Sequence, residues 1–284
     1  MPELPEVETI ARGLRLLLAC RTIVAVPYAA DHLVSNGVNR LRRELIGKHI
    51  RDVSRRGKLL FLDFQDDARL AFHLRMTGRL GVLPSVTLSP ASSRDQPGTS
   101  RDKHAHLLLD LDDQTTLYFQ DQRKFGTCRY FSGEELAAWP FYRDLGPEPL
   151  ELGVSDFQER IRGKKGRIKA LLLDQKFIAG IGNIYADESL FRASIHPATP
   201  ADRISPQRLE RLLVSIREVL TEALAASGSS IRDYRTAAGL VGTFQNNFFV
   251  YGCKGQPCKR CGNPLRTAKI AGRTTCFCPA CQKA

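Results

Sequence analysis

The sequence predicts an α+β protein in which a β-rich half precedes a helical half and a short tail with paired cysteines. Three observations support this fold class. Apolar residues recur at helical spacing in the first twenty residues, short apolar segments follow between residues 58 and 119, and helical spacing returns after residue 150. A chain of 284 residues is also long enough for two ordinary domains.

The first segment is predicted to be an amphipathic helix. Pro5 lies near its start, where a missing N–H costs nothing, and Val7, Ile10, Leu14 and Leu17 repeat at helical spacing. Short apolar segments bounded by turn residues then predict antiparallel strands of a β-sandwich at 58–64, 69–74, 106–111 and 115–119. The Ser/Pro-rich stretch between Pro84 and Arg101 lacks periodicity, so we expect a surface loop there.

The second half is predicted to be helical. Leu145-Gly-Pro-Glu-Pro-Leu150 interrupts regular structure, and Ser205 and Pro206 form a typical helix start. Helical spacing is found at 157–161, 168–177, 183–193 and 206–226. The predicted organisation is therefore an N-terminal domain at 1–131, a linker at 132–150, a helical domain at 151–249 and a cysteine-bearing finger at 250–284.

The charge of the chain favours a polyanionic partner. The formal net charge is +12, and the segment from Cys253 to the end carries seven Lys or Arg and no acidic residue. A merely basic soluble protein is the alternative. No apolar run is long enough to span a bilayer, and the acidic start Met-Pro-Glu-Leu-Pro-Glu does not resemble a signal peptide. We therefore expect a cytoplasmic protein without a membrane partner.

Two Cys-x-x-Cys pairs predict a metal site. Cys258 and Cys261 are separated by sixteen residues from Cys278 and Cys281, a spacing that lets two tight turns surround one tetrahedral ion. The pattern favours one structural Zn²⁺ over disulfides, which are rare in the cytoplasm, and over unrelated buried cysteines. Four thiolates leave no open position for a catalytic water. Between the pairs, the Gly272 region suits a hairpin tip that presents Arg273.

Several separated motifs together resemble the bacterial formamidopyrimidine-DNA glycosylase family, over essentially the whole chain. They are Pro2-Glu-Leu-Pro-Glu-Val-Glu-Thr9, Arg56-Gly-Lys58-Leu-Leu, His73-Leu-Arg-Met-Thr-Gly78, Lys103-His-Ala-His106, Asp121-Gln-Arg-Lys-Phe-Gly126, Leu145-Gly-Pro-Glu-Pro149, Gly180-Ile-Gly-Asn-Ile-Tyr185, Val250-Tyr-Gly252 and the cysteine pairs. The resemblance implies a β-sandwich domain followed by a helix–two-turns–helix domain with a zinc finger. It also implies a monomer that removes 8-oxoguanine and formamidopyrimidines from duplex DNA and then cuts the strand by β,δ-elimination.

The resemblance makes Pro2 the covalent nucleophile. Once Met1 is removed, Pro2 is a secondary amine with a pKa near the α-amino range of about 8, so a useful fraction is neutral and able to attack a sugar carbon. Glu3 stands beside it and resembles the acid/base group of the family. Taken alone, the same motif is an ordinary acidic helix start. The matching motifs elsewhere favour the catalytic interpretation.

The remaining site residues also follow from the resemblance. Lys58 and Arg273 complete the catalytic set, with Lys58 as a phosphate clamp near the lesion, although a solvated strand-end lysine is the common alternative. Met76, Arg123 and Phe125 resemble the trio that fills the space left by an extruded nucleotide, although a core methionine and phenylalanine are the default. Backbone phosphates are assigned to His104, Lys165 and Asn183.

Base selectivity is expected from the glycine- and serine-rich loop at 228–242, with a flexible connection as the alternative. The sequence departs from the family pattern in this loop, where serines replace threonine, and at Cys253, where arginine is common. Two rival functions remain. The sister enzyme endonuclease VIII shares fold and chemistry but prefers oxidised pyrimidines, and a non-catalytic module would bind DNA without cutting it.

Overall fold

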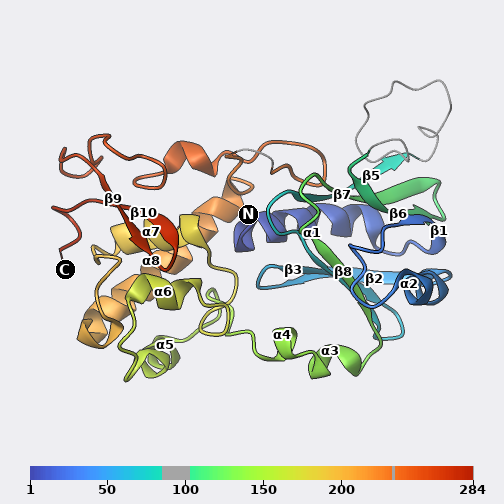
Figure 1. Cartoon of the computed structure of the whole chain (residues 1–284), viewed down its shortest axis with the longest axis horizontal. Helices are drawn as coiled ribbons and strands as arrows, with labels where there is room; N and C mark the ends of the chain where they lie inside the picture. The colour runs from blue at the N-terminus through green and yellow to red at the C-terminus, as the bar shows by residue number, and fades with distance from the viewer. Residues whose placement is uncertain (85–102, 232–233, 284) are drawn as a thin grey trace. The chain divides into compact units, whose positions relative to one another are not determined.

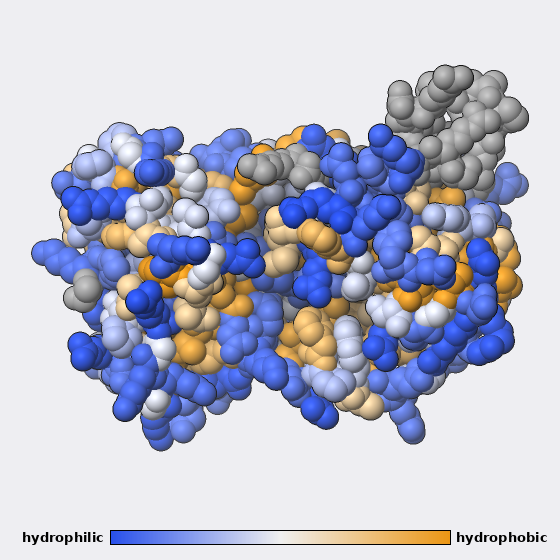
Figure 2. Space-filling model, in the orientation of Figure 1, coloured by the Kyte–Doolittle hydropathy of each residue, from blue (hydrophilic) through white to orange (hydrophobic). Residues whose placement is uncertain are grey.

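The chain folds into two compact units (Figure 1). The computed structural model describes residues 1–84, 103–231 and 234–283. Unit 1 comprises Met1–Arg143 and Ser227–Gly242, and unit 2 comprises Asp144–Ala226 and Thr243–Ala284. On the face drawn in Figure 2, hydrophilic residues cover most of the surface, with smaller apolar areas between them. Within the described residues, no helix is long and apolar enough to cross a membrane.

Unit 1 contains two four-stranded antiparallel sheets. The strands of the first follow the order β1 (Ile23–Ala29), β6 (Ala105–Leu111), β7 (Thr115–Asp121) and β5 (Gly78–Pro84). Those of the second follow the order β2 (Ile50–Arg56), β3 (Leu59–Phe64), β4 (Arg69–His73) and β8 (Thr127–Phe131). Strands β3, β4, β6 and β7 correspond to the four predicted segments. The predicted loop between Pro84 and Arg101 lies almost entirely outside the described residues.

The N-terminal helix α1 (Leu4–Leu18) is shared by both sheets. It contacts β2 and β3 of one sheet and β5 of the other (Figure 1). Val7, Ile10 and Leu14 are buried in the core of unit 1, as predicted. Leu17 was also expected in this row, but it is 44% exposed, and Leu18 is buried instead. The buried face continues from Leu14 by four residues rather than three, because both spacings lie close to one helical turn.

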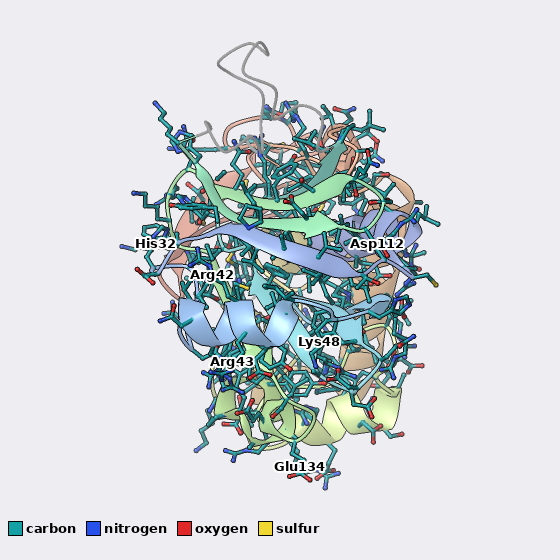
Figure 3. All side chains as sticks on the ribbon, turned by 90° about the vertical axis from the view of Figure 1, so that its right-hand side faces the viewer. His32, Arg42, Arg43, Lys48, Asp112 and Glu134 are labelled. Carbon is teal, nitrogen blue, oxygen red and sulfur yellow. The ribbon has the colours of Figure 1, made fainter. Side chains whose placement is uncertain are left out.

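Short helices complete unit 1. Helix α2 (Val38–Leu45) lies at the end of the sandwich that faces the viewer in Figure 3, where Arg42 and Arg43 are labelled. Helices α3 (Glu135–Ala138) and α4 (Pro140–Arg143) occupy part of the predicted linker. Residues 132–143 of the predicted linker are grouped with unit 1.

Unit 2 combines helices with a β-hairpin. Its helices are α5 (Val154–Ile161), α6 (Ile168–Leu173), α7 (Asn183–Arg192) and α8 (Pro206–Ala225), and its hairpin pairs β9 (Arg266–Ile270) with β10 (Arg273–Phe277). The helical segments agree with the predicted ones, and the Ser205 hydroxyl accepts a hydrogen bond from the Arg208 N–H at the start of α8. Helices α7 and α8 each end one residue before the predicted end. Helix α6 stops at Leu173, four residues before the predicted end at residue 177.

One imidazole is buried where β4 ends. His73 is 7% exposed, and its Nδ1 accepts a hydrogen bond from the Arg75 N–H at 3.1 Å. Burial, followed by the positive charges of Arg75 and Lys58, lowers the pKa of His73 to about 3. The neutral ring thereby holds the turn that connects β4 to β5.

This buried ring predicts a pH dependence of stability. The folded pKa of His73 lies below the unfolded value of about 6.5, so the unfolded state binds more protons between these values. The free energy of unfolding therefore falls as the pH drops below about 6.5, by up to about 1.4 kcal/mol per pH unit for this group. We expect His73→Asn to flatten that dependence in urea unfolding series, whereas His49→Asn at a partly exposed site keeps it. Equal pH slopes in all three proteins contradict the prediction.

Candidate nucleic-acid interface and metal centre

The start of α1 is built by two reciprocal hydrogen bonds. The Glu3 side chain accepts from the backbone N–H of Glu6, and the Glu6 Oε2 accepts from the Glu3 N–H at 2.9 Å. This capping box satisfies two backbone donors that a helix start leaves without partners. Glu3 is 3% exposed and Glu6 is 2% exposed, and Pro2 is buried beside them. The structure therefore places the Glu3 carboxylate at a fixed position next to residue 2.

The loop at 228–242 is attached to this helix start. The Ser229 N–H donates to the second oxygen of Glu6 at 2.7 Å, and the Tyr234 hydroxyl donates to the Ser227 carbonyl at 3.1 Å. Gly228 has a φ of +79°, and a Cβ there would lie 2.9 Å from the Glu6 Oε1, so only glycine fits. Residues 232–233 of this predicted selectivity loop lie outside the described residues.

These contacts explain a difference from the predicted domain boundaries. The predicted helical domain at 151–249 includes the loop at 228–242. The structure groups this segment with unit 1, because a buried carboxylate of α1 binds its backbone. The Glu6 side chain, with its two oxygens used in this way, is a structural anchor of the loop.

Lys58 lies in the tight turn between β2 and β3. Arg56 pairs with Leu59, and Gly57 adopts a φ of +57° between them. The Lys58 residue is only 7% exposed. The alternative of a solvated strand-end lysine is therefore wrong, and its ammonium group is held close enough to His73 to affect the pKa of that ring.

The predicted insertion trio lies on the surface of unit 1. Met76 is 41% exposed and Phe125 is 54% exposed, so neither is a core residue. The exposed Arg123 guanidinium lies 4.8 Å from the centroid of the Phe125 ring. His104 is partly exposed and comes directly before β6, and its carbonyl accepts a hydrogen bond from the N–H of Asp121. Two large apolar side chains in water beside a cation suit stacking against bases.

Unit 2 carries the other predicted contacts. Lys165 is exposed in the turn before α6, and Asn183 is the first residue of α7, after a glycine turn in which Gly180 has a φ of +84°. Arg273 is exposed and begins β10, directly after the Ala271-Gly272 turn. The predicted hairpin tip is therefore present. Backbone N–H groups at the start of α7 and the side chains of these residues suit phosphate oxygens.

The strand after Arg273 is held at three consecutive residues. The Asn183 Nδ2 donates to the Thr274 carbonyl at 3.0 Å, and the Lys169 ammonium donates to the Thr275 hydroxyl at 2.7 Å. The Cys276 N–H donates to the Asp187 Oδ2 at 3.0 Å. These contacts join α6 and α7 to the hairpin and so fix the backbone beside Arg273.

A buried ion pair supports this attachment. Lys169 and Asp187 lie 2.6 Å apart with side chains at most 1% exposed. Burial raises the pKa of Asp187 to about 6, although the nearby ammonium of Lys169 opposes that rise. The neighbouring Glu188 is also buried and accepts hydrogen bonds from the N–H groups of Phe249, Val250 and Tyr251. The sequence analysis does not single out Lys169, Asp187 or Glu188. A charged residue within an apolar row at helical spacing was the only feature of the sequence that could have indicated them.

The four predicted cysteine ligands converge. All ligand atoms of Cys258, Cys261, Cys278 and Cys281 lie within 4.8 Å of one another. The Cys258–Cys281 and Cys261–Cys278 sulfur distances are 3.9 and 3.5 Å, which fit the edges of about 3.8 Å in a tetrahedron with Zn–S bonds of about 2.3 Å. All eight cysteines of the chain are free, so the disulfide alternative is wrong. The clustered thiols confirm the prediction of a structural zinc.

Loss of this metal site should unfold the hairpin while unit 1 stays folded. Structural zinc contributes folding free energy of order 10 kcal/mol, because the ligands are brought together only in the folded state. We expect Cys261→Ser to lose the bound zinc and the slow amide exchange of β9 and β10. Cys253→Ser, which changes a thiol outside the metal group, should keep both. Zinc content and hydrogen exchange measure the outcome, and a full zinc content in Cys261→Ser contradicts it.

Comparisons with known proteins agree with this geometry. Three family profiles match in succession: the formamidopyrimidine-DNA glycosylase N-terminal domain at residues 1–128, the H2TH domain of the same family at 145–235, and the zinc finger found in FPG and IleRS at 255–284. The formamidopyrimidine-DNA glycosylase of Chloroflexus aurantiacus is 42% identical over 99% of this chain and 98% of its own length. That of Nitratidesulfovibrio vulgaris is 54% identical over 75% of this chain, which spans only 55% of that relative.

Solved structures show the same fold. A point mutant of Lactococcus lactis FPG in complex with DNA containing Fapy-dG superposes with a TM-score of 0.88 at 36% identity, over the full length of both chains. Other complexes of that protein contain DNA with an abasic site or an oxidised pyrimidine, at TM-scores of 0.88 and 0.87. The predicted α+β fold with a helix–two-turns–helix domain and a zinc finger is confirmed. The chain therefore belongs to the formamidopyrimidine-DNA glycosylase family.

Proposed function

We propose that this protein is a bifunctional glycosylase/AP lyase of base-excision repair that acts on oxidised purines in duplex DNA. The observation that carries the proposal is the buried capping box, which holds the Glu3 carboxylate beside residue 2 and anchors the loop at 228–242. Family membership and the solved complexes of a relative with Fapy-dG and abasic DNA support it. We also propose a cytoplasmic location and a monomer, as the family resemblance implies.

The chemistry begins after removal of Met1. The neutral amine of Pro2 attacks C1′ of the damaged nucleotide, so that a C1′–N bond to Pro2 forms as the bond to the base breaks. The proton that the Pro2 nitrogen loses passes to the departing base, which leaves as a neutral molecule. Glu3 donates a proton to the sugar ring oxygen as the ring opens, which leaves an iminium between Pro2 and C1′. Binding of the Glu3 backbone N–H by Glu6 keeps this carboxyl group in place during the proton transfer.

Strand cleavage follows from the iminium. It acidifies the hydrogens on C2′, so a base removes one of them and the C3′–O bond breaks with loss of the 3′ phosphate. A second elimination breaks the C5′–O bond, and water then hydrolyses the iminium and releases Pro2. We assign to Lys58 the neutralisation of phosphate charge next to the reacting sugar, because its buried setting fixes the position of the cation.

Each unit carries side chains that we assign to DNA. We propose that Met76, Phe125 and Arg123 fill the space that the extruded nucleotide leaves in the duplex. The apolar Met76 and the aromatic Phe125 replace the lost base stacking. The Arg123 guanidinium hydrogen-bonds the base that has lost its partner. His104, Lys165, Asn183 and Arg273 are assigned to backbone phosphates. Contacts of this kind orient the duplex without reading its sequence.

Borohydride trapping tests the proposed reaction. Reduction of the iminium should link the wild-type protein to an abasic duplex and to an 8-oxoguanine·cytosine duplex, with the adduct on Pro2. We expect Pro2→Gly to lose most of this trapping, because the secondary amine is removed. Pro5→Ala, which changes the proline inside α1, should trap normally. Absence of an adduct with wild-type protein supports the non-catalytic DNA-binding alternative, and an adduct on a lysine contradicts the role of Pro2.

Lesion preference tests the substrate class separately. Single-turnover excision rates should be higher for 8-oxoguanine and formamidopyrimidine than for oxidised pyrimidines in otherwise identical duplexes. The comparison is informative because the Lactococcus relative has been solved with both kinds of lesion. Faster excision of the pyrimidine lesions would assign the chain the preference of endonuclease VIII.

A further inference from the structure

Three surface segments of unit 1 carry most of the side chains assigned to DNA in that unit. They are the turn between β4 and β5 with Met76, the residues before β6 with His104, and the turn between β7 and β8 with Arg123 and Phe125. All three are hydrogen-bonded to one residue, Asp121, which ends β7 and is 1% exposed.

The Asp121 carboxylate binds two of these turns. Its Oδ1 accepts from the Thr77 hydroxyl, which follows Met76, and from the Arg123 N–H at 3.2 Å. Its Oδ2 accepts from the Gly126 N–H at 2.7 Å. The Thr77 hydroxyl oxygen in turn lies 3.2 Å from the same Arg123 N–H. The carboxylate thus joins the residue after Met76 to both ends of the segment that carries Arg123 and Phe125.

The backbone of Asp121 binds the third segment. Its N–H donates to the His104 carbonyl at 2.9 Å, and its carbonyl oxygen lies 2.8 Å from the Nε2 of the buried His106. The Lys124 N–H donates to the same carbonyl at 3.3 Å. One residue therefore fixes the relative positions of all three segments.

The turn after Asp121 has little freedom to adopt another shape. Lys124 has a φ of +57°, a conformation that residues with side chains rarely adopt. A Cβ on Gly126 would lie 2.5 Å from the Phe119 ring and 3.1 Å from the Asp121 Oδ2. Such a turn persists only where its surroundings impose it, and the acceptor oxygens of Asp121 meet its backbone donors at both ends.

We propose that Asp121 is a positioning residue that sets the geometry of Met76, Arg123 and Phe125 for insertion into duplex DNA. The inference rests on the proposed function of the trio. An ionised carboxylate offers only acceptors, which matches the three donors around it. In Asp121→Asn, one carboxylate oxygen becomes an NH₂ group that faces a backbone N–H or the Thr77 hydroxyl. Residue 121 thereby loses one hydrogen-bond acceptor, while its side chain keeps its size.

The test compares two substrates with the zinc-loaded full-length protein. Excision of 8-oxoguanine from a duplex needs the trio, whereas strand cleavage at an abasic site in a single-stranded oligonucleotide has no base stack to replace. We expect Asp121→Asn to slow single-turnover duplex excision by roughly tenfold to a hundredfold, because small misplacements at a site are costly. Its cleavage of the single-stranded substrate should stay within about twofold of wild type, since the amine and Glu3 are untouched.

Matched variants control for stability. Asp110 accepts from the Thr116 hydroxyl at 2.7 Å, a similar carboxylate–threonine pair that joins β6 to β7. Asp110→Asn should leave both rates unchanged, and Met76→Ala should reproduce the selective loss on duplex. Thr77→Val removes one hydroxyl and keeps the carboxylate, so it should show a smaller loss of the same kind even where Asp121→Asn folds poorly.

The outcomes separate this inference from the proposed function. An equal loss on both substrates by Asp121→Asn and Thr77→Val shows a general folding role and overturns the inference. An unchanged duplex rate in both variants also overturns it. A wild-type protein that acts on neither substrate contradicts the proposed function itself, and the inference fails with it.

Discussion

The proposed reaction centre depends on the hydrogen bonds that the Glu6 carboxylate accepts. One oxygen binds the backbone of Glu3 and the other binds the backbone of Ser229, with both bonds buried. Charged groups are rarely buried unless several donors satisfy them, and here backbone N–H groups do so. A single side chain thus sets the position of the predicted acid/base and of the predicted selectivity loop.

Buried carboxylates also bind backbone N–H groups in unit 2. Asp187 and Glu188 are consecutive residues of α7, and both are buried acceptors of backbone N–H groups from the C-terminal part of the unit. The zinc site gives the finger its internal order, whereas these acids attach it to the helices. Orientation of Arg273 therefore depends on helix side chains as well as on the metal. Buried carboxylates that bind backbone fix loops more exactly than exposed ion pairs, which contribute little.

Local patterns predicted the elements with strong apolar content. Strands β3, β4 and β6 are almost entirely buried and β7 is mostly buried, so they stand out as apolar segments. Paired Cys-x-x-Cys spacing predicted the metal ligands. Strand β2 reads Ile-Arg-Asp-Val-Ser-Arg-Arg, and its mostly polar residues hid it. The link between Glu6 and Ser229 spans 223 residues, and no local pattern encodes it. Lys169 and Asp187 left only a weak signal, because the sequence does not show which charges are buried together.

Unit 1 is built from two segments that are far apart in the sequence, and this affects how the chain folds during synthesis. Residues 1–143 contain both sheets, but Gly228 and Ser229 emerge from the ribosome only after the four helices of unit 2 have been made. Domains generally fold as their residues appear, so the sandwich can form early while the oxygen of Glu6 that binds Ser229 waits for its partner. The last backbone contact at the start of α1 is therefore made late. A nascent chain therefore cannot complete the proposed reaction centre until most of the protein has been synthesised.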